Sequence, residues 1–208
     1  MKKSLLFIAV LTLYSAFCFS SVELSPRLFG DFLITKYDTE AYSENFTITD
    51  FGAEAQGNFW FAKSGKFEFG LSAGLDLGGG IFKIEAEDNV NSSSVTEENS
   101  QFTFGLSIAP AIQATFGWMH SFYVAPGFRF AFTRVAVSDG NTSETPSYFI
   151  PEFSAEVGYK LWLWENLSLT AGYKYELPLS IIGSSTIFTF DRANAHRFFA
   201  GVSWKVFN

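Results

Sequence analysis

Residues 67–77 read FEFGLSAGLDL, and this stretch decides the fold. Large apolar residues at the odd positions alternate with small or acidic residues at the even positions. A helix turns 100° per residue and would scatter Glu68 and Asp76 among the leucines, whereas a strand sends successive side chains to opposite faces. The stretch therefore predicts a β-strand with one apolar face and one polar face.

The same alternation repeats along the rest of the chain. Three short turns, near residues 62–66, 117–121 and 162–166, interleave with four long polar stretches, near residues 38–45, 80–101, 136–146 and 180–195. This spacing predicts an all-β fold: a closed, antiparallel, up-and-down transmembrane barrel of about eight strands with short periplasmic turns and long external loops. The first strand, near residues 24–37, alternates less cleanly, and its facing stays open. The other expected strands lie near residues 51–61, 67–77, 102–116, 123–133, 149–161, 167–177 and 197–206.

The volume of the apolar residues indicates which face of the barrel meets lipid. A secreted lipocalin-like barrel also alternates, with its apolar side inward. An eight-stranded barrel is just wide enough inside to be filled by side chains, and the apolar positions, with many of the chain's 26 Phe among them, would not fit there. A Lys or Arg turned to the bilayer midplane costs about 2–4 kcal/mol. The apolar face is therefore expected outside and the charged face inside.

The charged residues of the inner face are expected to pair with one another. Unpaired buried charge costs several kcal/mol per ion, so a closed lumen needs near balance of signs. We predict a packed lumen rather than an open pore. Its predicted charge network comprises Glu54, Glu68, Asp76, Arg129, Glu152, Glu156, Lys160, Lys174 and Glu176.

The five Trp residues all fall at or beside the short turns or near the C-terminus. Trp prefers the membrane interface, where its ring is buried and its N–H stays hydrated. We therefore predict a periplasmic aromatic girdle. Its members are Trp60, Trp118, Trp162, Trp164 and Trp204.

The first twenty residues have the pattern of a Sec signal peptide. Lys2 and Lys3 precede an apolar run and a small-residue stretch that ends at Ser20, where cleavage is expected. Lipidation of Cys18 is the alternative, although bulky Phe17 precedes it. Residues 1–20 are thus expected to be a signal peptide, and residues 21–208 the barrel. Removing the two lysines changes the net charge from −7 to −9, which argues against nucleic acid as a partner.

In this pattern the chain resembles the small eight-stranded bacterial outer-membrane barrels, the group of OmpX, OmpW, Opa and the OmpA barrel. The resemblance covers residues 22–208 and includes no motif of one subfamily. It implies location in the cell outer membrane. The expected partners are outer-membrane lipid, periplasmic chaperones, the barrel-insertion machinery and a host or matrix ligand at the loops. One departure concerns the C-terminus, where Phe207 is out of phase with outward Val202, Trp204 and Val206.

The sequence offers little support for an enzyme, a cofactor or a metal. A Ser, His and acid set at Ser184, Ser185, His196 and Asp191 would suit attack on a lipid ester. His196 also fits an ordinary rim residue, and His120 lies in a distant turn. Gly78, Gly79 and Gly80 lack the Lys and the helix of a phosphate loop. The acids of the second loop lack the spacing of a calcium loop and are expected to be solvated surface: Glu85, Glu87, Asp88, Glu97 and Glu98.

Three functions remain open from the residues. The first is a structural or adhesive surface barrel whose loops contact host molecules, because recognition concentrates in such loops. The second is a narrow, OmpW-like channel for small or apolar solutes, which small inward residues such as Gly70 and Gly74 would accommodate. The third is the lipid-modifying enzyme. We expect the first, and no enzymatic activity.

Overall fold

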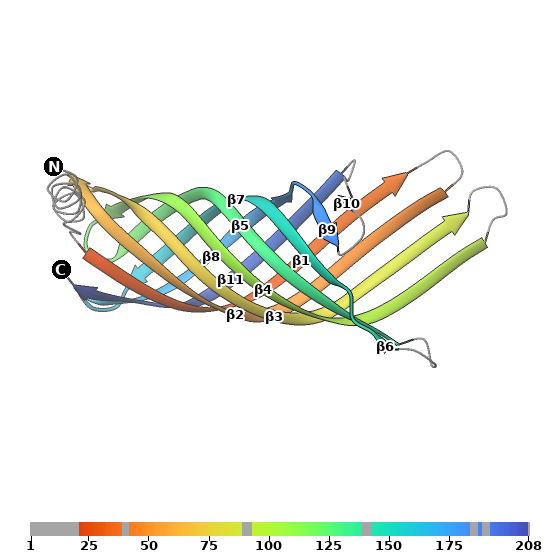
Figure 1. Ribbon diagram of the computed structural model, residues 1–208. Coiled ribbons are helices and arrows are strands. Elements are labelled where there is room, and N and C mark those ends of the chain that lie inside the picture. The colour runs from red at the N-terminus through yellow and green to blue at the C-terminus, as the bar shows by residue number, and fades with distance from the viewer. Residues whose placement is uncertain are drawn as a thin grey trace, which may run out of the picture.

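The computed structural model describes residues 21–38, 42–88, 93–138, 143–183, 187–188 and 192–207, and Figure 1 shows the chain. These residues form eight long strands and three short ones. The long strands are β1 Ser21–Asp38, β2 Tyr42–Ser64, β3 Phe67–Asp88, β4 Ser93–Phe116, β5 His120–Ser138, β7 Ser147–Trp162, β8 Leu167–Pro178 and β11 Arg192–Phe207. The short strands are β6 Ser143–Glu144, β9 Ile181–Gly183 and β10 Ile187–Phe188.

The eight long strands form a closed antiparallel ring. Each pairs with its neighbours in chain order, and β1 closes the ring against β11 from Leu24↔Trp204 to Lys36↔Arg192. The predicted up-and-down barrel is confirmed. Among the described residues, no helix is long and apolar enough to cross a membrane. β1 begins and β11 ends at the end of the barrel that carries the short turns (Figure 1).

The three short turns are where the sequence predicts them. Residues 65–66, 117–119 and 163–166 connect the strands at one end. Gly65 and Gly117 have φ angles of 61° and 62°, in the left-handed region that glycine enters without a steric penalty. Both turns therefore depend on a backbone conformation that glycine adopts at lower energy than other residues.

The second predicted loop, at residues 80–101, is largely a hairpin instead. β3 continues to Asp88 and β4 begins at Ser93, with Lys83 opposite Glu98 and Glu85 opposite Thr96. Polarity there reflects solvent on both faces and does not interrupt the strands. The β1–β2 hairpin extends similarly, with Asp38 opposite Ser43. In Figure 1 these two hairpins project beyond the rest of the barrel at the end opposite the short turns.

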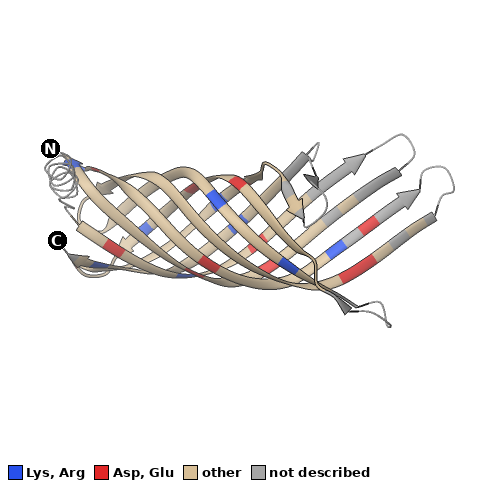
Figure 2. Cartoon of the chain, viewed as in Figure 1, with Lys and Arg blue, Asp and Glu red and all other residues tan. Residues whose placement is uncertain are grey.

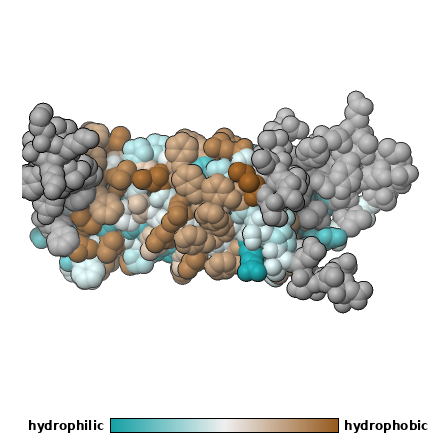
Figure 3. Space-filling model, viewed as in Figure 1, coloured by the Kyte–Doolittle hydropathy of each residue, from teal (hydrophilic) through white to brown (hydrophobic). Residues whose placement is uncertain are grey.

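Within the closed part of the barrel, burial alternates along the long strands and confirms the predicted facing. Large apolar side chains such as Leu28 and Phe51 are 71% and 70% exposed on the outer wall. On the face seen in Figure 3, apolar residues cover much of the middle of the barrel. In β1 the odd residues point inward, and they include Phe29 and Leu33 as well as Arg27. These two inward apolar residues explain why the alternation of β1 is blurred in the sequence.

Inward aromatic rings lie against glycines of neighbouring strands. A Cβ on Gly52 would come within 2.1 Å of the Leu77 carbonyl oxygen and 2.6 Å of the Phe29 ring. A Cβ on Gly158 would come within 2.3 Å of the Tyr123 ring. A strand glycine often marks such close approach. These positions let large rings fit inside a narrow barrel.

Candidate functional site

The nine residues of the predicted charge network all lie inside the barrel. None exposes more than 5% of its surface. Figure 2 shows how basic and acidic residues are distributed along the strands. Their side chains meet in the lumen in three groups, one in the middle of the barrel and one toward each end.

The first group joins two cations to two carboxylates. Arg27 pairs with Glu54 at 2.9 Å and with Glu156 at 2.7 Å. Lys174 reaches the same two acids at 3.1 and 3.3 Å. The guanidinium of Arg27 also lies 4.0 Å from the centre of the Phe199 ring. Each charge is thus compensated by two opposite charges, which buried ions require.

The second group lies closer to the protruding hairpins. Arg129 contacts Asp76 and Glu152, each at 2.7 Å. Arg197 contacts Asp31 at 2.7 Å and Asp76 at 3.5 Å. Glu176 lies between the two guanidinium groups, 3.7 Å from Arg129 and 3.8 Å from Arg197.

The third group lies near the short turns. Lys160 pairs with Glu23 and donates a hydrogen bond to Gln113 Oε1 at 2.8 Å. Gln113 in turn donates to Glu68 at 2.9 Å. Lys160 also faces the Tyr123 ring at 5.0 Å. Polar and aromatic groups alternate here along the lumen.

Some of these contacts join strands on opposite sides of the ring. β2 and β7 are four positions apart in the ring of eight, and Gln56 of β2 donates to Glu156 of β7 at 3.2 Å. β1 and β5 are also opposite, and Arg27 donates to the Tyr123 hydroxyl at 3.1 Å. Side chains therefore reach right across the lumen at this level.

The sequence missed several members of the network. Glu23, Arg27 and Asp31 belong to β1, whose facing was open, and Arg197, the partner of Asp31, belongs to β11. The expected balance of signs was also wrong, since the buried residues include eight carboxylates and five basic groups. Neutral donors take the place of cations. Gln101 and Thr103 donate to Asp50, as Gln113 does to Glu68.

Two members of the predicted aromatic girdle point inward instead. Trp60 exposes 0% and Trp162 4% of its surface, and Trp162 donates to Ser121 Oγ at 2.8 Å. Trp60 follows the inward, even-numbered register of Glu54, and Trp162 that of Lys160. Strand parity thus overrides the preference of Trp for the interface. Trp118, Trp164 and Trp204 are exposed near the short turns, and their role in a girdle stays a prediction.

Tryptophan fluorescence is expected to separate these two classes. Variants that keep a single Trp would be refolded into vesicles that contain brominated lipid, which quenches indoles in contact with it. Trp204 is expected to be quenched, because its ring is 56% exposed on the outer wall, and Trp60 to be unaffected. Quenching of Trp60 equal to that of Trp204 would contradict the inward placement.

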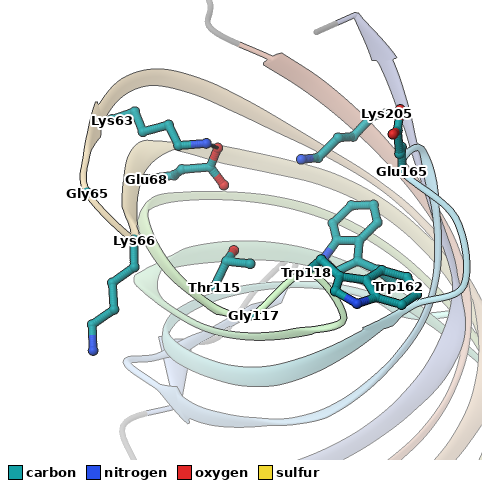
Figure 4. Close-up of a pocket in the computed structure, with 10 residues that line it drawn as sticks. All are labelled: Lys63, Gly65, Lys66, Glu68, Thr115, Gly117, Trp118, Trp162, Glu165 and Lys205. Carbon is teal, nitrogen blue, oxygen red and sulfur yellow. Dashed lines mark ion pairs between the residues drawn. The ribbon is translucent and has the colours of Figure 1, made fainter.

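A pocket of about 410 Å³ opens at the short-turn end. Figure 4 shows Lys63 beside Glu68, with which it pairs at 3.5 Å. Lys205 lies 4.6 Å from the centre of the Trp162 ring. The pocket is lined by residues from all three turns, so it forms a polar mouth. Behind this pocket, the side chains of Gln113 and Lys160 occupy the lumen.

The two histidines make similar contacts at opposite ends of the outer wall. His120 lies 2.6 Å from the Tyr159 hydroxyl, and His196 lies 2.6 Å from the Tyr173 hydroxyl. Ser184, Ser185 and Asp191, the other members of the predicted catalytic set, lie outside the described residues. Among the described residues, no group of three or more His, Cys, Asp or Glu is placed to hold a metal ion.

The protruding hairpins present an acidic surface. Lys83 pairs with Glu85 at 2.7 Å, and the hydrogen bond to Glu85 raises the pKa of the Lys83 ammonium above its ordinary value. Glu97 and Glu98 are exposed on β4. β4 pairs with β5 only from Ser100 onward, so its residues 93–99 pair with β3 alone among the described strands. The other edge of this segment has no strand partner in the part of the chain that the structure describes.

Comparison with known proteins gives a family and a fold. The family model described as outer membrane protein beta-barrel domain matches residues 11–205. No curated protein matches the chain. The solved structures that resemble it include OprG from Pseudomonas aeruginosa, with a TM-score of 0.57, 8% identity and coverage of 90% of this chain and 96% of that one.

Two other similar structures have the same architecture. Neisserial surface protein A has a TM-score of 0.55 and 9% identity, with 88% of this chain and 96% of that one covered. Ail, the attachment invasion locus protein of Yersinia pestis, solved in complex with the heparin analogue sucrose octasulfate, has a TM-score of 0.51 and 13% identity, with 88% and 98% covered. At these identities the likeness establishes the fold.

Proposed function

This chain belongs to the outer membrane protein β-barrel domain family, and on that premise we propose that it is a closed surface barrel whose protruding hairpins bind a protein ligand outside the cell. Membership in the family places the protein in the cell outer membrane. Export by a signal peptide at residues 1–20, which lie outside the described residues, is part of the proposal.

The protruding sheet carries the proposal. Strands β1 to β4 continue past the level at which β4 leaves β5, and among the described strands residues 93–99 of β4 have a partner on one edge only. An extended peptide adds to such an edge through main-chain hydrogen bonds. Long, exposed edges are usually blocked in proteins that do not use them. A sheet held outside the membrane is therefore suited to capture a strand of another protein.

The charge of the sheet favours a basic ligand. Glu97 and Glu98 lie on the open strand, with Glu85 on its neighbour. The net charge of the chain is −7. Ail was solved with a heparin analogue, a polyanion, and the acidic β4 edge would repel such a ligand. We therefore propose a basic polypeptide segment for this chain.

The lumen supports the closed part of the proposal. The contacts of Gln56 with Glu156 and of Arg27 with Tyr123 join opposite walls. A solute would have to displace ion pairs that are buried on all sides. The narrow-channel alternative has no comparable observation in its favour.

The experiment compares binding by refolded wild-type protein in nanodiscs with binding by a variant in which residues 84–97 are replaced by a two-residue turn. The probe is an immobilised synthetic Lys-rich strand peptide. We expect the variant to lose binding at least about tenfold, the effect of about 1.4 kcal/mol. A second variant, Glu97→Lys with Glu98→Lys, should lose binding to the Lys-rich peptide. The control Glu165→Lys, at the short-turn end, should keep it.

Conductance in planar bilayers completes the test. Wild-type protein and the shortened variant are both expected to be silent, because the ion pairs of the lumen lie in the part of the barrel that they share. Equal binding by both proteins would overturn the ligand site. Reproducible conductance would overturn the closed lumen.

A further inference from the structure

The polar mouth at the short-turn end has a lining unlike that of the outer wall. Lysines, glutamates, tryptophans, a threonine and two glycines surround its volume of about 410 Å³. Among the residues that the structure describes, no aliphatic side chain and no phenylalanine lines this pocket. A few well-placed polar groups fix the orientation of a ligand in a pocket. The lining therefore suits a hydrated polar ligand and offers no apolar slot for a lipid tail.

Two ammonium groups converge on the opening of the mouth. In Figure 4, Lys63 at the end of β2 and Lys205 of β11 reach toward each other. Lys63 lies 3.5 Å from Glu68, whose other carboxylate oxygen accepts a hydrogen bond from Gln113 at 2.9 Å. Lys205 contacts the Trp162 ring and forms no ion pair with a carboxylate of the described residues. Two like charges that face one space favour an anion between them.

The ring of Trp118 offers a flat surface beside these lysines. Trp118 is 68% exposed and lines the pocket next to Trp162 (Figure 4). The face of an aromatic ring is electronegative, and the C–H groups on the face of a sugar ring are weakly electropositive, so the two rings stack. Glu165 and Thr115 line the same opening and can exchange hydrogen bonds with sugar hydroxyl groups. The mouth thus combines a platform for a sugar ring with groups that bind its polar edge.

The charge of this end is opposite to that of the protruding hairpins. Lys63, Lys66 and Lys205 line the mouth, and Glu165 is the one exposed carboxylate among the described residues of the short turns. The acidic surface of the hairpins lies at the other end of the barrel. A polyanion is therefore attracted to the periplasmic mouth and repelled from the external end.

We propose that the polar mouth binds a carboxylate-bearing glycan in the periplasm. A carboxylate of the glycan lies between the ammonium groups of Lys63 and Lys205, where each charged hydrogen bond is stronger than a neutral one. A sugar ring of the same strand stacks on Trp118. The lysines and the indole require an anion and a sugar ring in one molecule, so a wall polymer satisfies the site and a free carboxylate does not. This contact would hold the barrel to the cell wall.

The test is cosedimentation of the full refolded barrel, in detergent micelles, with insoluble peptidoglycan sacculi. Wild-type protein is expected to bind native sacculi about tenfold better than sacculi whose carboxylates have been converted to amides, since a charged hydrogen bond is worth about that ratio. Lys63→Gln with Lys205→Gln should lose the same factor on native sacculi. Lys83→Gln with Arg134→Gln removes two cations at the opposite end of the barrel and is the matched control, which should keep binding.

The sugar part of the site has its own matched pair of variants. Trp118→Ala should weaken binding about three- to tenfold, the worth of one aromatic contact. This loss should be the same at low and high salt, because stacking is not screened as an ion pair is. Trp164→Ala removes a ring that is 62% exposed but does not line the pocket, and it should leave binding unchanged.

Three results would overturn the proposal. Equal binding of native and amidated sacculi by wild-type protein would mean that the mouth does not recognise carboxylates. Equal losses in the two lysine and arginine double variants would reduce the effect to overall charge. Displacement of the barrel from sacculi by poly-glutamate as effectively as by soluble peptidoglycan fragments would assign the mouth to an acidic polypeptide. The first comparison changes the glycan and not the protein, so it holds even if a variant fails to fold.

Discussion

Replacement of Arg27 by methionine is expected to destabilise the folded barrel by about 3–5 kcal/mol, because it leaves buried carboxylates without their counter-charge. Arg27 contacts Glu54 at 2.9 Å and Glu156 at 2.7 Å, and all three side chains are at most 3% exposed. Lys174 would remain as the single cation between two acids. The measurement is urea unfolding in lipid vesicles, followed by Trp fluorescence.

Lys63→Met provides the matched control for this result. Lys63 also pairs with a carboxylate, that of Glu68, but its side chain is 61% exposed. Exposed ion pairs contribute about 0–1 kcal/mol, so the free energy of unfolding of the control should differ from that of wild type by no more than this amount. If Arg27→Met lowered the free energy of unfolding as little as Lys63→Met does, water and not Arg27 would compensate the acids of the lumen. Restoration of stability by Glu156→Gln in the Arg27→Met background would tie the loss to this pair.

The second large effect is expected on the outer wall. Leu28 is 71% exposed, seven residues after the start of β1 and ten before its end. Leu28→Arg should cost about 2–4 kcal/mol in a bilayer, the penalty for a cation at the midplane. The comparison is Leu179→Arg, at a side chain 54% exposed just past the end of β8, where a cation should cost about 0–1 kcal/mol.

The solvent distinguishes this prediction from an ordinary packing loss. In short-chain detergent micelles, which leave water close to the wall, the difference between the two arginine variants should shrink. A difference of the same size in micelles and vesicles would mean that Leu28 is held by protein contacts rather than by lipid. That outcome would contradict the assignment of the apolar face to the membrane.

The sequence predicted the strands because their signal is local. The alternation from Phe67 to Leu77 is complete within eleven residues, and each strand repeats it independently. It also predicted which face is inside, because side-chain volume and the cost of charge in lipid do not depend on register. The sequence did not predict the hairpin at residues 80–101, because a strand solvated on both faces loses the alternation while its backbone pairing continues.

The inward positions of Trp60 and Trp162 show where residue preference fails. Their parity with Glu54 and Lys160 was present in the sequence, and it is a stronger constraint than the affinity of Trp for an interface. One residue of slip would turn every side chain of the strand to the other face. If strand parity is applied before residue preference, it predicts that both Trp rings lie inside the barrel.

The sequence by itself determined the barrel: its strand count, its short turns, its apolar wall and its charged interior. Only the tertiary structure decided which charges meet. Arg27 and Glu156 are 129 positions apart in the chain, and they come together because closure of β1 on β11 curves the sheet until distant strands face each other across the lumen. Alternation is a property of each strand alone, whereas pairing across the barrel depends on the register and curvature of all eight.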